Sequence, residues 1–131
     1  MVAEYARRGL EPDGSDEDRQ AAYWAGVNSA RWQEAVTLER TSPVVLCDSD
    51  PLKLHYSWCL ARVGAAPWSR FEHELHHARA GLEAGRLGLA DLVVVSIPSV
   101  EVLERRKAGD HSRRRRAFAL HATLGDPLRE W

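Results

Sequence analysis

Two aspartates follow directly on an apolar run in "VVLCDSDP", residues 44–51. Val44 to Cys47 has the composition of a strand that is buried on both faces. Carboxylates at the carboxyl end of such a strand lie where open α/β sheets bind their ligands. Asp48 is therefore a candidate site residue. Asp50 precedes Pro51, so it also fits the N-cap of a following helix.

A second pattern with chemical meaning is "HELHH" at residues 73–77, which matches H-E-x-x-H on a predicted helix. His73 and His77 would share one face as zinc ligands, with Glu74 as general base. The sequence brings no third ligand to this pair. A solvated, charge-rich helix face explains the same residues, so a zinc hydrolase is kept only as an outside alternative.

The elements that must position these residues alternate between helices and strands. Strands are expected at 44–47 and at about 92–97, and helices at about 16–40, 51–63, 67–84, 100–107 and 111–124, with a last turn from Pro127. Strands separated by helices indicate a parallel sheet with right-handed crossovers. We therefore expect one α/β domain over residues 1–131. Ser15 or Asp16 is expected to cap the first long helix, and Gly64 to end the second.

Composition limits the classes of partner. The chain has 18 basic and 19 acidic residues and a net charge of −1, which predicts neither nucleic-acid nor membrane binding. We expect a small-molecule partner instead. Cys47 and Cys59 are the only cysteines, a number typical of a reduced, cytoplasmic protein.

Four motifs in order resemble a known family: "EYARR" at 4–8, "VVLCDSD" at 44–50 with "YSW" at 56–58, "DLVVVSIP" at 91–98, and "RRRRAFALH" at 113–121. Their order and spacing resemble the P-loop kinase-like NTPases of the ribosylnicotinamide-kinase type and their bacterial ATP-binding relatives of the AAA type. The resemblance covers nearly all of residues 4–131. It implies a three-layer α/β fold and the transfer of a phosphoryl group from ATP, with Mg²⁺, to a small hydroxyl compound such as a nucleoside or riboside.

The resemblance also implies roles for single residues. Glu4 would be the general base or would anchor the substrate, and Arg7 would contact substrate or phosphate. Asp48 would hold Mg²⁺. Asp50 is a second acid that would contact the metal or the substrate.

A lid over about residues 105–118 is implied by the same resemblance. Arg113 and Arg116 would neutralise charge on the transferring phosphoryl group, and Arg114 and Arg115 would contact the nucleotide. A solvated face is the other common explanation of such a run of charge.

Three residues could line an aromatic pocket for the phosphate acceptor: Trp24, Asn28 and Trp58. Packing in the core is the alternative explanation for the two tryptophans.

The chain departs from the family at the phosphate-binding loop. No G-x-x-x-x-G-K-[ST] occurs, and the only lysines are Lys53 and Lys107. The loop that cradles the phosphates would lie upstream of Met1 with the first strand, so the chain looks N-terminally truncated relative to the family. We expect it to be inactive as given and its apolar strand edges to favour self-association. A non-catalytic binding or interaction module is the alternative function.

Overall fold

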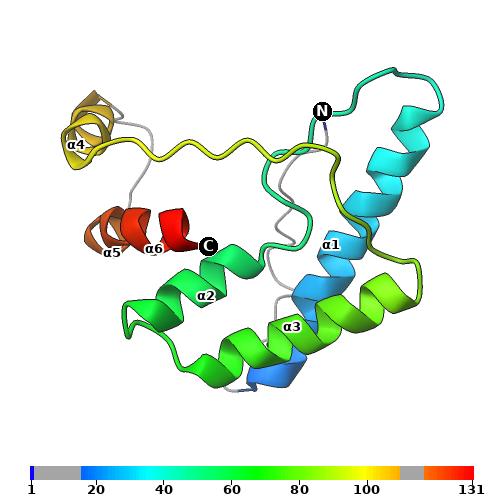
Figure 1. Ribbon diagram of the computed structural model, residues 1–131, viewed down its shortest axis with the longest axis horizontal. Helices are drawn as coiled ribbons and strands as arrows, with labels where there is room; N and C mark the ends of the chain where they lie inside the picture. Colours follow the sequence, from blue (N-terminus) through cyan, green and yellow to red (C-terminus); the bar gives the residue numbers. More distant parts are fainter. Residues whose placement is uncertain (2–15, 110–116) are drawn as a thin grey trace.

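Six helices make up the regular structure of the described part of the chain, residues 1, 16–109 and 117–131 of a computed structural model (Figure 1). They are α1 (Glu17–Glu39), α2 (Leu54–Arg62), α3 (Trp68–Glu83), α4 (Val100–Gly109), α5 (Phe118–Thr123) and α6 (Gly125–Glu130). The predicted helices are therefore found, with shifted bounds; of the one expected at 111–124, the described part is α5. The turn expected from Pro127 lies inside α6.

The predicted α/β fold is wrong, because the described residues contain no sheet. Within the described residues, the two expected strands are extended segments outside any sheet, with a single bridge residue at Cys47, and several of their side chains face solvent: Val44 is 70 % exposed, Leu46 66 % and Val94 84 %. Figure 1 shows the second segment as a long connection from α3 to α4. β-Branched residues favour an extended backbone, but a sheet also needs a partner strand for its hydrogen bonds.

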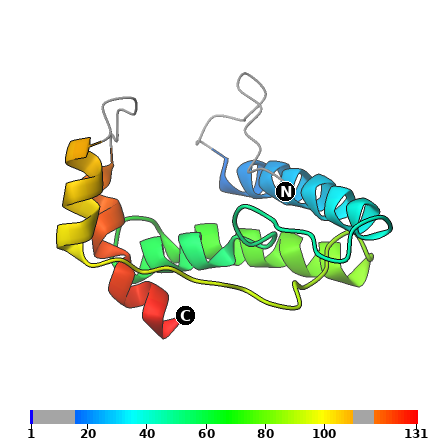
Figure 2. The ribbon, with the colours of Figure 1, turned by 90° about the horizontal axis from the view of Figure 1, so that it is seen from above.

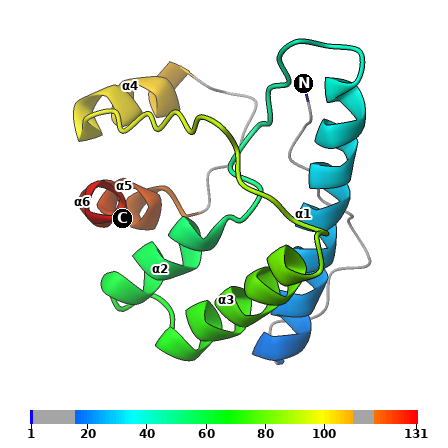
Figure 3. The same cartoon turned by 45° about the vertical axis from the view of Figure 1, so that its right-hand side comes forward.

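Helix α1 begins where the sequence predicts, because the Asp16 carboxylate accepts a hydrogen bond from the Arg19 backbone N–H at 2.9 Å. It crosses α3, and this is the most extensive contact between helices (Figure 3). Hydrogen bonds between polar side chains stabilise this contact: the Ser69 hydroxyl donates to the Glu17 carboxylate at 2.6 Å. Near the other end, the Gln33 amide donates to the Arg86 carbonyl at 3.4 Å.

Small residues let the chain pass close to these helices. A Cβ atom on Gly81 of α3 would lie 2.7 Å from a methyl carbon of Leu87, and one on Gly88 would overlap the ring of Trp32 from α1. Leu87 is buried as a result. The segment after α3 is thus held against both α3 and α1.

Helix α2 also contacts α6 near the C-terminus, and Figure 2 shows the C-terminal helices beside the helices of the first part of the chain. Cys59 and Leu60 of α2 are buried with Leu124, which lies between α5 and α6. The turn that leaves α2 uses Gly64 at a φ of 71°, as expected for a residue just beyond a helix end. Helix α4 has no buried residue.

Candidate functional site

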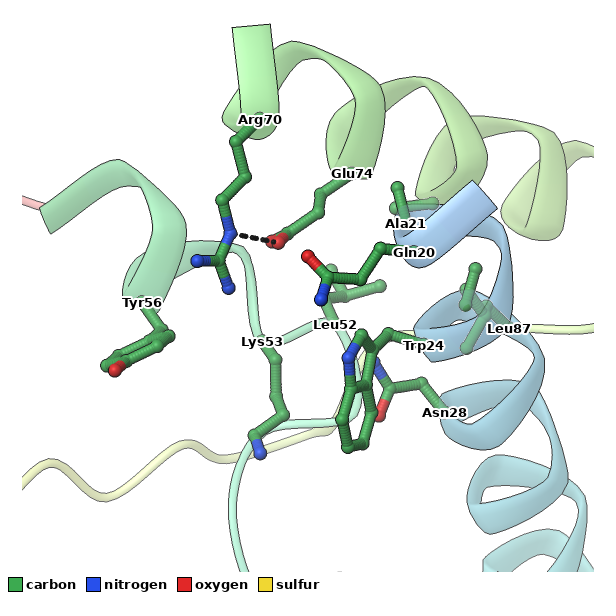
Figure 4. Close-up of a pocket in the computed structure, with 12 residues that line it drawn as sticks. Gln20, Ala21, Trp24, Asn28, Leu52, Lys53, Tyr56, Arg70, Glu74 and Leu87 are labelled. Carbon is green, nitrogen blue, oxygen red and sulfur yellow. Dashed lines mark hydrogen bonds and ion pairs between the residues drawn. The ribbon is translucent and has the colours of Figure 1, made fainter. Parts of the chain in front are cut away.

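A pocket of about 250 Å³ lies where α1 and α3 meet the start of α2 (Figure 4). Its wall combines apolar, aromatic, amide and charged side chains. They are Gln20, Ala21, Trp24, Ala25 and Asn28 from α1, Leu52, Lys53 and Tyr56 around the start of α2, Arg70, Glu74 and Ala78 from α3, and Leu87.

The loop that brings residues 48–53 to the pocket is held by a buried arginine. Arg31 of α1 is only 4 % exposed. Its guanidinium donates to the backbone carbonyls of Asp48 and Ser49, the second at 3.3 Å, and lies 3.4 Å from the Asn28 amide oxygen. The conformation of this loop therefore depends on α1.

Two residues of the loop have a left-handed backbone. Ser49 has a φ of 73° and Lys53 a φ of 54°, a region that side chains other than glycine seldom adopt. Between them, the Asp50 carboxylate accepts a hydrogen bond from the Leu52 N–H at 3.2 Å. Strained backbone of this kind is concentrated at ligand sites.

Asp50 was expected to cap a helix that starts at Pro51, but α2 starts at Leu54 and its N-cap residue is Lys53. Asp50 instead closes a local turn, because its carboxylate bonds to the N–H two residues ahead. Burial raises the pKa of Asp50, but hydrogen bonds from His55 and from the N–H groups of Leu52 and Lys53 outweigh it and hold the pKa below its usual value.

Lys53 places a cation beside an aromatic ring of the pocket. Its ammonium lies 5.9 Å from the centre of the Trp24 ring, within the range of a cation–π contact. Burial lowers the pKa of this ammonium, and the nearby Glu74 carboxylate raises it again in part. In Figure 4 the side chain runs between the rings of Tyr56 and Trp24.

Helix α3 contributes a second cation and the one carboxylate of the lining. Arg70 and Glu74 lie one turn apart and form an ion pair at 3.1 Å. The Arg70 guanidinium also lies 6.0 Å from the Tyr56 ring centre. With Lys53, the lining carries two cations and one anion, which leaves one net positive charge.

The structure places only some of the residues predicted to bind substrate or metal at the pocket. Trp24 and Asn28 line the pocket. Trp58 does not; it packs against the Cys59–Leu60–Leu124 cluster and lies 5.4 Å from the Trp131 ring. Asp48 is exposed, and Arg31 contacts its backbone carbonyl.

Six other predicted site residues lie outside the described residues: Glu4, Arg7, Arg113, Arg114, Arg115 and Arg116. Of the expected lid at 105–118, the described parts are the end of α4 and the start of α5.

Two of the three histidines in "HELHH" contact a carboxylate from α1. His77 lies 2.9 Å and His73 3.3 Å from the same oxygen of Asp18, while Glu74 faces the pocket instead. The hydrogen bond from His77 and the charges of both histidines lower the pKa of Asp18. Among residues 16–109 and 117–131, no group of three histidine, cysteine or acidic side chains could hold a metal ion. The zinc alternative thus gains no support.

Sequence reasoning missed most of the polar residues of the pocket, among them Gln20, Lys53, Tyr56, Arg70 and the role of Glu74. One signal was present: Lys53 is one of only two lysines and lies three residues after an aspartate implicated in the site.

Comparison of the chain with family models, with curated proteins and with solved structures gives no match. Within the part of the chain that the structure covers, no helix has both the length and the apolar character needed to cross a membrane.

Proposed function

We propose that this protein is a binding module for a small organic anion that contains a flat ring, and that the pocket between α1, α2 and α3 is its site. The observation that carries the proposal is the half-buried Lys53 ammonium beside the Trp24 indole at the mouth of a preformed pocket. This deepens the binding-module alternative that the sequence left open.

The size of the pocket limits the ligand. Pockets for drug-sized ligands usually measure roughly 300–1,000 Å³, and this one measures about 250 Å³. A single ring with one acidic substituent fits this volume better than a nucleoside triphosphate. The ring would stack on Trp24, with the amide of Asn28 as a neighbouring hydrogen-bonding group.

Charge favours an acidic ligand. The lining carries the cations Lys53 and Arg70 and one carboxylate, Glu74, so its net charge is positive. The lowered pKa of Lys53 shows that burial makes the charged form costly. A carboxylate or phosphate would favour the charged ammonium, and would be held by it in turn.

Phosphoryl transfer stays a prediction that rests on the motif resemblance. The fold that the resemblance implied is absent from the described residues. Neither Asp48 nor Asp50 belongs to the pocket lining. The geometry of the pocket therefore gives no argument for the binding of ATP or Mg²⁺.

The experiment is isothermal titration with three probes of similar size. We expect benzoate to bind, benzamide to bind more weakly because it lacks the charge, and cyclohexanecarboxylate to bind more weakly because it lacks the flat ring. Lys53→Gln should weaken benzoate binding about tenfold, the value of one charge-assisted hydrogen bond of roughly 1.5 kcal/mol.

Lys107→Gln is the matched control, because it makes the same charge change on exposed α4. The proposal fails if benzoate shows no binding, or if both lysine variants weaken it equally.

The compartment that we propose is the cytoplasm. Cys47 and Cys59 are both free thiols, and burial raises the pKa of the Cys59 thiol, with the Glu130 carboxylate adding to the effect. A chain whose two cysteines do not form a disulfide suits a reducing compartment.

A further inference from the structure

We propose that Lys53 forms a reversible imine with a carbonyl group of the ligand, so that the pocket takes aromatic aldehydes or ketones that carry an acidic group. This inference rests on the proposed binding function and adds a covalent step to it. It follows from the position of the amine, from the groups that surround it and from the chemistry that these allow.

The backbone that carries the amine is fixed. Lys53 is the N-cap residue of α2 and has a left-handed φ of 54°. The loop before it is tied to α1 through Arg31 and is closed by the Asp50 turn. An amine on such a fixed backbone loses less freedom when it reacts than one on a mobile loop.

The pocket places a flat surface beside the amine. The ammonium lies 5.9 Å from the centre of the Trp24 ring. A ligand ring stacked on this indole would bring a carbonyl substituent within reach of Lys53. The acidic group of the ligand would then turn from Lys53 to Arg70, which lines the same pocket and would share its charge between this group and Glu74.

The surroundings also favour the reactive form of the amine. Only a neutral amine attacks a carbonyl, and burial lowers the pKa of Lys53, although Glu74 opposes this in part. The charged and titratable groups around the amine are Arg70 and Glu74 from α3 and Tyr56 from α2. Glu74 is ion-paired with Arg70, and the Tyr56 hydroxyl lies 3.2 Å from a ring nitrogen of His121, so the protons of the reaction would exchange with solvent.

The step balances without any further reagent. The Lys53 nitrogen uses its electron pair to form a bond to the carbonyl carbon; the nitrogen then loses one proton and the oxygen gains one, which gives a carbinolamine. Protonation of the hydroxyl group lets it leave as water, and loss of the second nitrogen proton gives the imine. Hydrolysis runs the same steps in reverse and releases the carbonyl compound.

The test uses the small number of lysines in this chain. The protein is incubated with 4-carboxybenzaldehyde at neutral pH, and the imine is trapped with cyanoborohydride. Digestion with an acid-specific protease and mass spectrometry then give the rate of labelling at Lys53, Lys107 and the Met1 amine.

We expect Lys53 to be labelled at least tenfold faster than Lys107, which lies exposed on α4. The rate at Lys53 should also reach its maximum at lower pH than the rate at Lys107. Lys53→Arg should abolish the fast labelling and Lys107→Arg should leave it unchanged. Equal rates at the two lysines, or fast labelling that survives in Lys53→Arg, would overturn the inference.

A ligand without an aldehyde or ketone group separates the test of this inference from the test of the proposed function. 4-(Hydroxymethyl)benzoate keeps the ring and the acidic group but cannot form an imine. If it binds and Lys53 is not labelled selectively by the aldehyde, the binding function stands and the imine is refuted. If it does not bind and labelling is unselective, both are refuted.

Discussion

Replacing Arg31 should damage both the stability of the protein and its pocket. Arg31→Met keeps most of the length and volume of the side chain but removes the guanidinium. The carbonyls of Asp48 and Ser49 then lose their donor on α1. The loop that carries Lys53 would no longer be fixed.

The size of the effect follows from these contacts. A hydrogen bond from a charged donor contributes roughly 1.5–3 kcal/mol to stability. Two such bonds would give about 3–6 kcal/mol, but the carbonyls are only partly buried, so water can replace part of the loss. We expect Arg31→Met to lower the free energy of unfolding by about 2–4 kcal/mol.

Urea unfolding followed by circular dichroism measures this loss. Amide hydrogen exchange at residues 48–54 reports whether the loop is released. Arg31→Lys is the matched variant, since it keeps the charge but presents a single nitrogen in place of a fork. It should recover part of the stability.

The reasoning would be refuted if Arg31→Met unfolds within about 0.5 kcal/mol of the natural protein, the range of an ordinary surface substitution. Unchanged exchange at residues 48–54 would refute it as well, because the loop would then be held by other contacts.

Further outcomes concern pH, self-association and nucleotide binding. The hydrogen bond with His77 lowers the pKa of Asp18 in the folded protein, so the contribution of Asp18 to stability is present above pH 3.8 and is lost as the pH falls through the lower folded-state pKa. The melting temperature of Asp18→Asn should therefore differ from that of the natural protein near neutral pH and approach it in strong acid. A difference that stays constant with pH would contradict this. Val94→Lys should reduce self-association, measured by sedimentation velocity, because it places a charge in the exposed segment at 92–97. The control Ala90→Lys, which lies outside that segment, should not reduce it. Equal sedimentation of the two variants would exclude this segment as the contact. Titration with Mg·ATP should give a dissociation constant in the millimolar range or weaker, because the sequence has no glycine-rich loop with a lysine. Binding in the low micromolar range would show that another segment forms a phosphate site.

The helices were predictable because their signals are local. Asp16 caps α1, and Gly64 follows α2 in a left-handed conformation. Each signal acts within a few residues of the helix end that it sets. Asp50 bonds to the Leu52 N–H as a helix cap would, but the start of α2 was misplaced because Lys53 has a left-handed backbone, which a helix that began at Pro51 could not contain.

The sheet was wrongly predicted because a strand depends on a partner elsewhere in the chain. The residues at 44–47 and 92–97 favour an extended backbone, which the structure shows, but they do not specify what they pair with. Helix packing between α1 and α3 organises the described core instead.

The pocket was only partly predictable for a related reason. Trp24 and Asn28 share a helix face, so their joint position follows from helical spacing. Lys53, Arg70 and Glu74 reach the same space only after α2 and α3 have packed against α1. No short motif contains that information. The "HELHH" pattern predicted a local metal site, but its residues have other partners. His73 and His77 contact Asp18 of α1, and Glu74 lines the pocket.

The crossing of α1 and α3 has a consequence for synthesis on the ribosome. Its polar contacts join Glu17 to Ser69, Gln33 to Arg86, and Asp18 to His77, over separations of 52, 53 and 59 residues. Helix α1 therefore leaves the exit tunnel long before its partner exists, and closing so long a loop delays its packing. Until Arg86 has emerged, the side of α1 that carries Ala21 and Ala35, both buried in the folded protein, stays in solution or is protected by a chaperone.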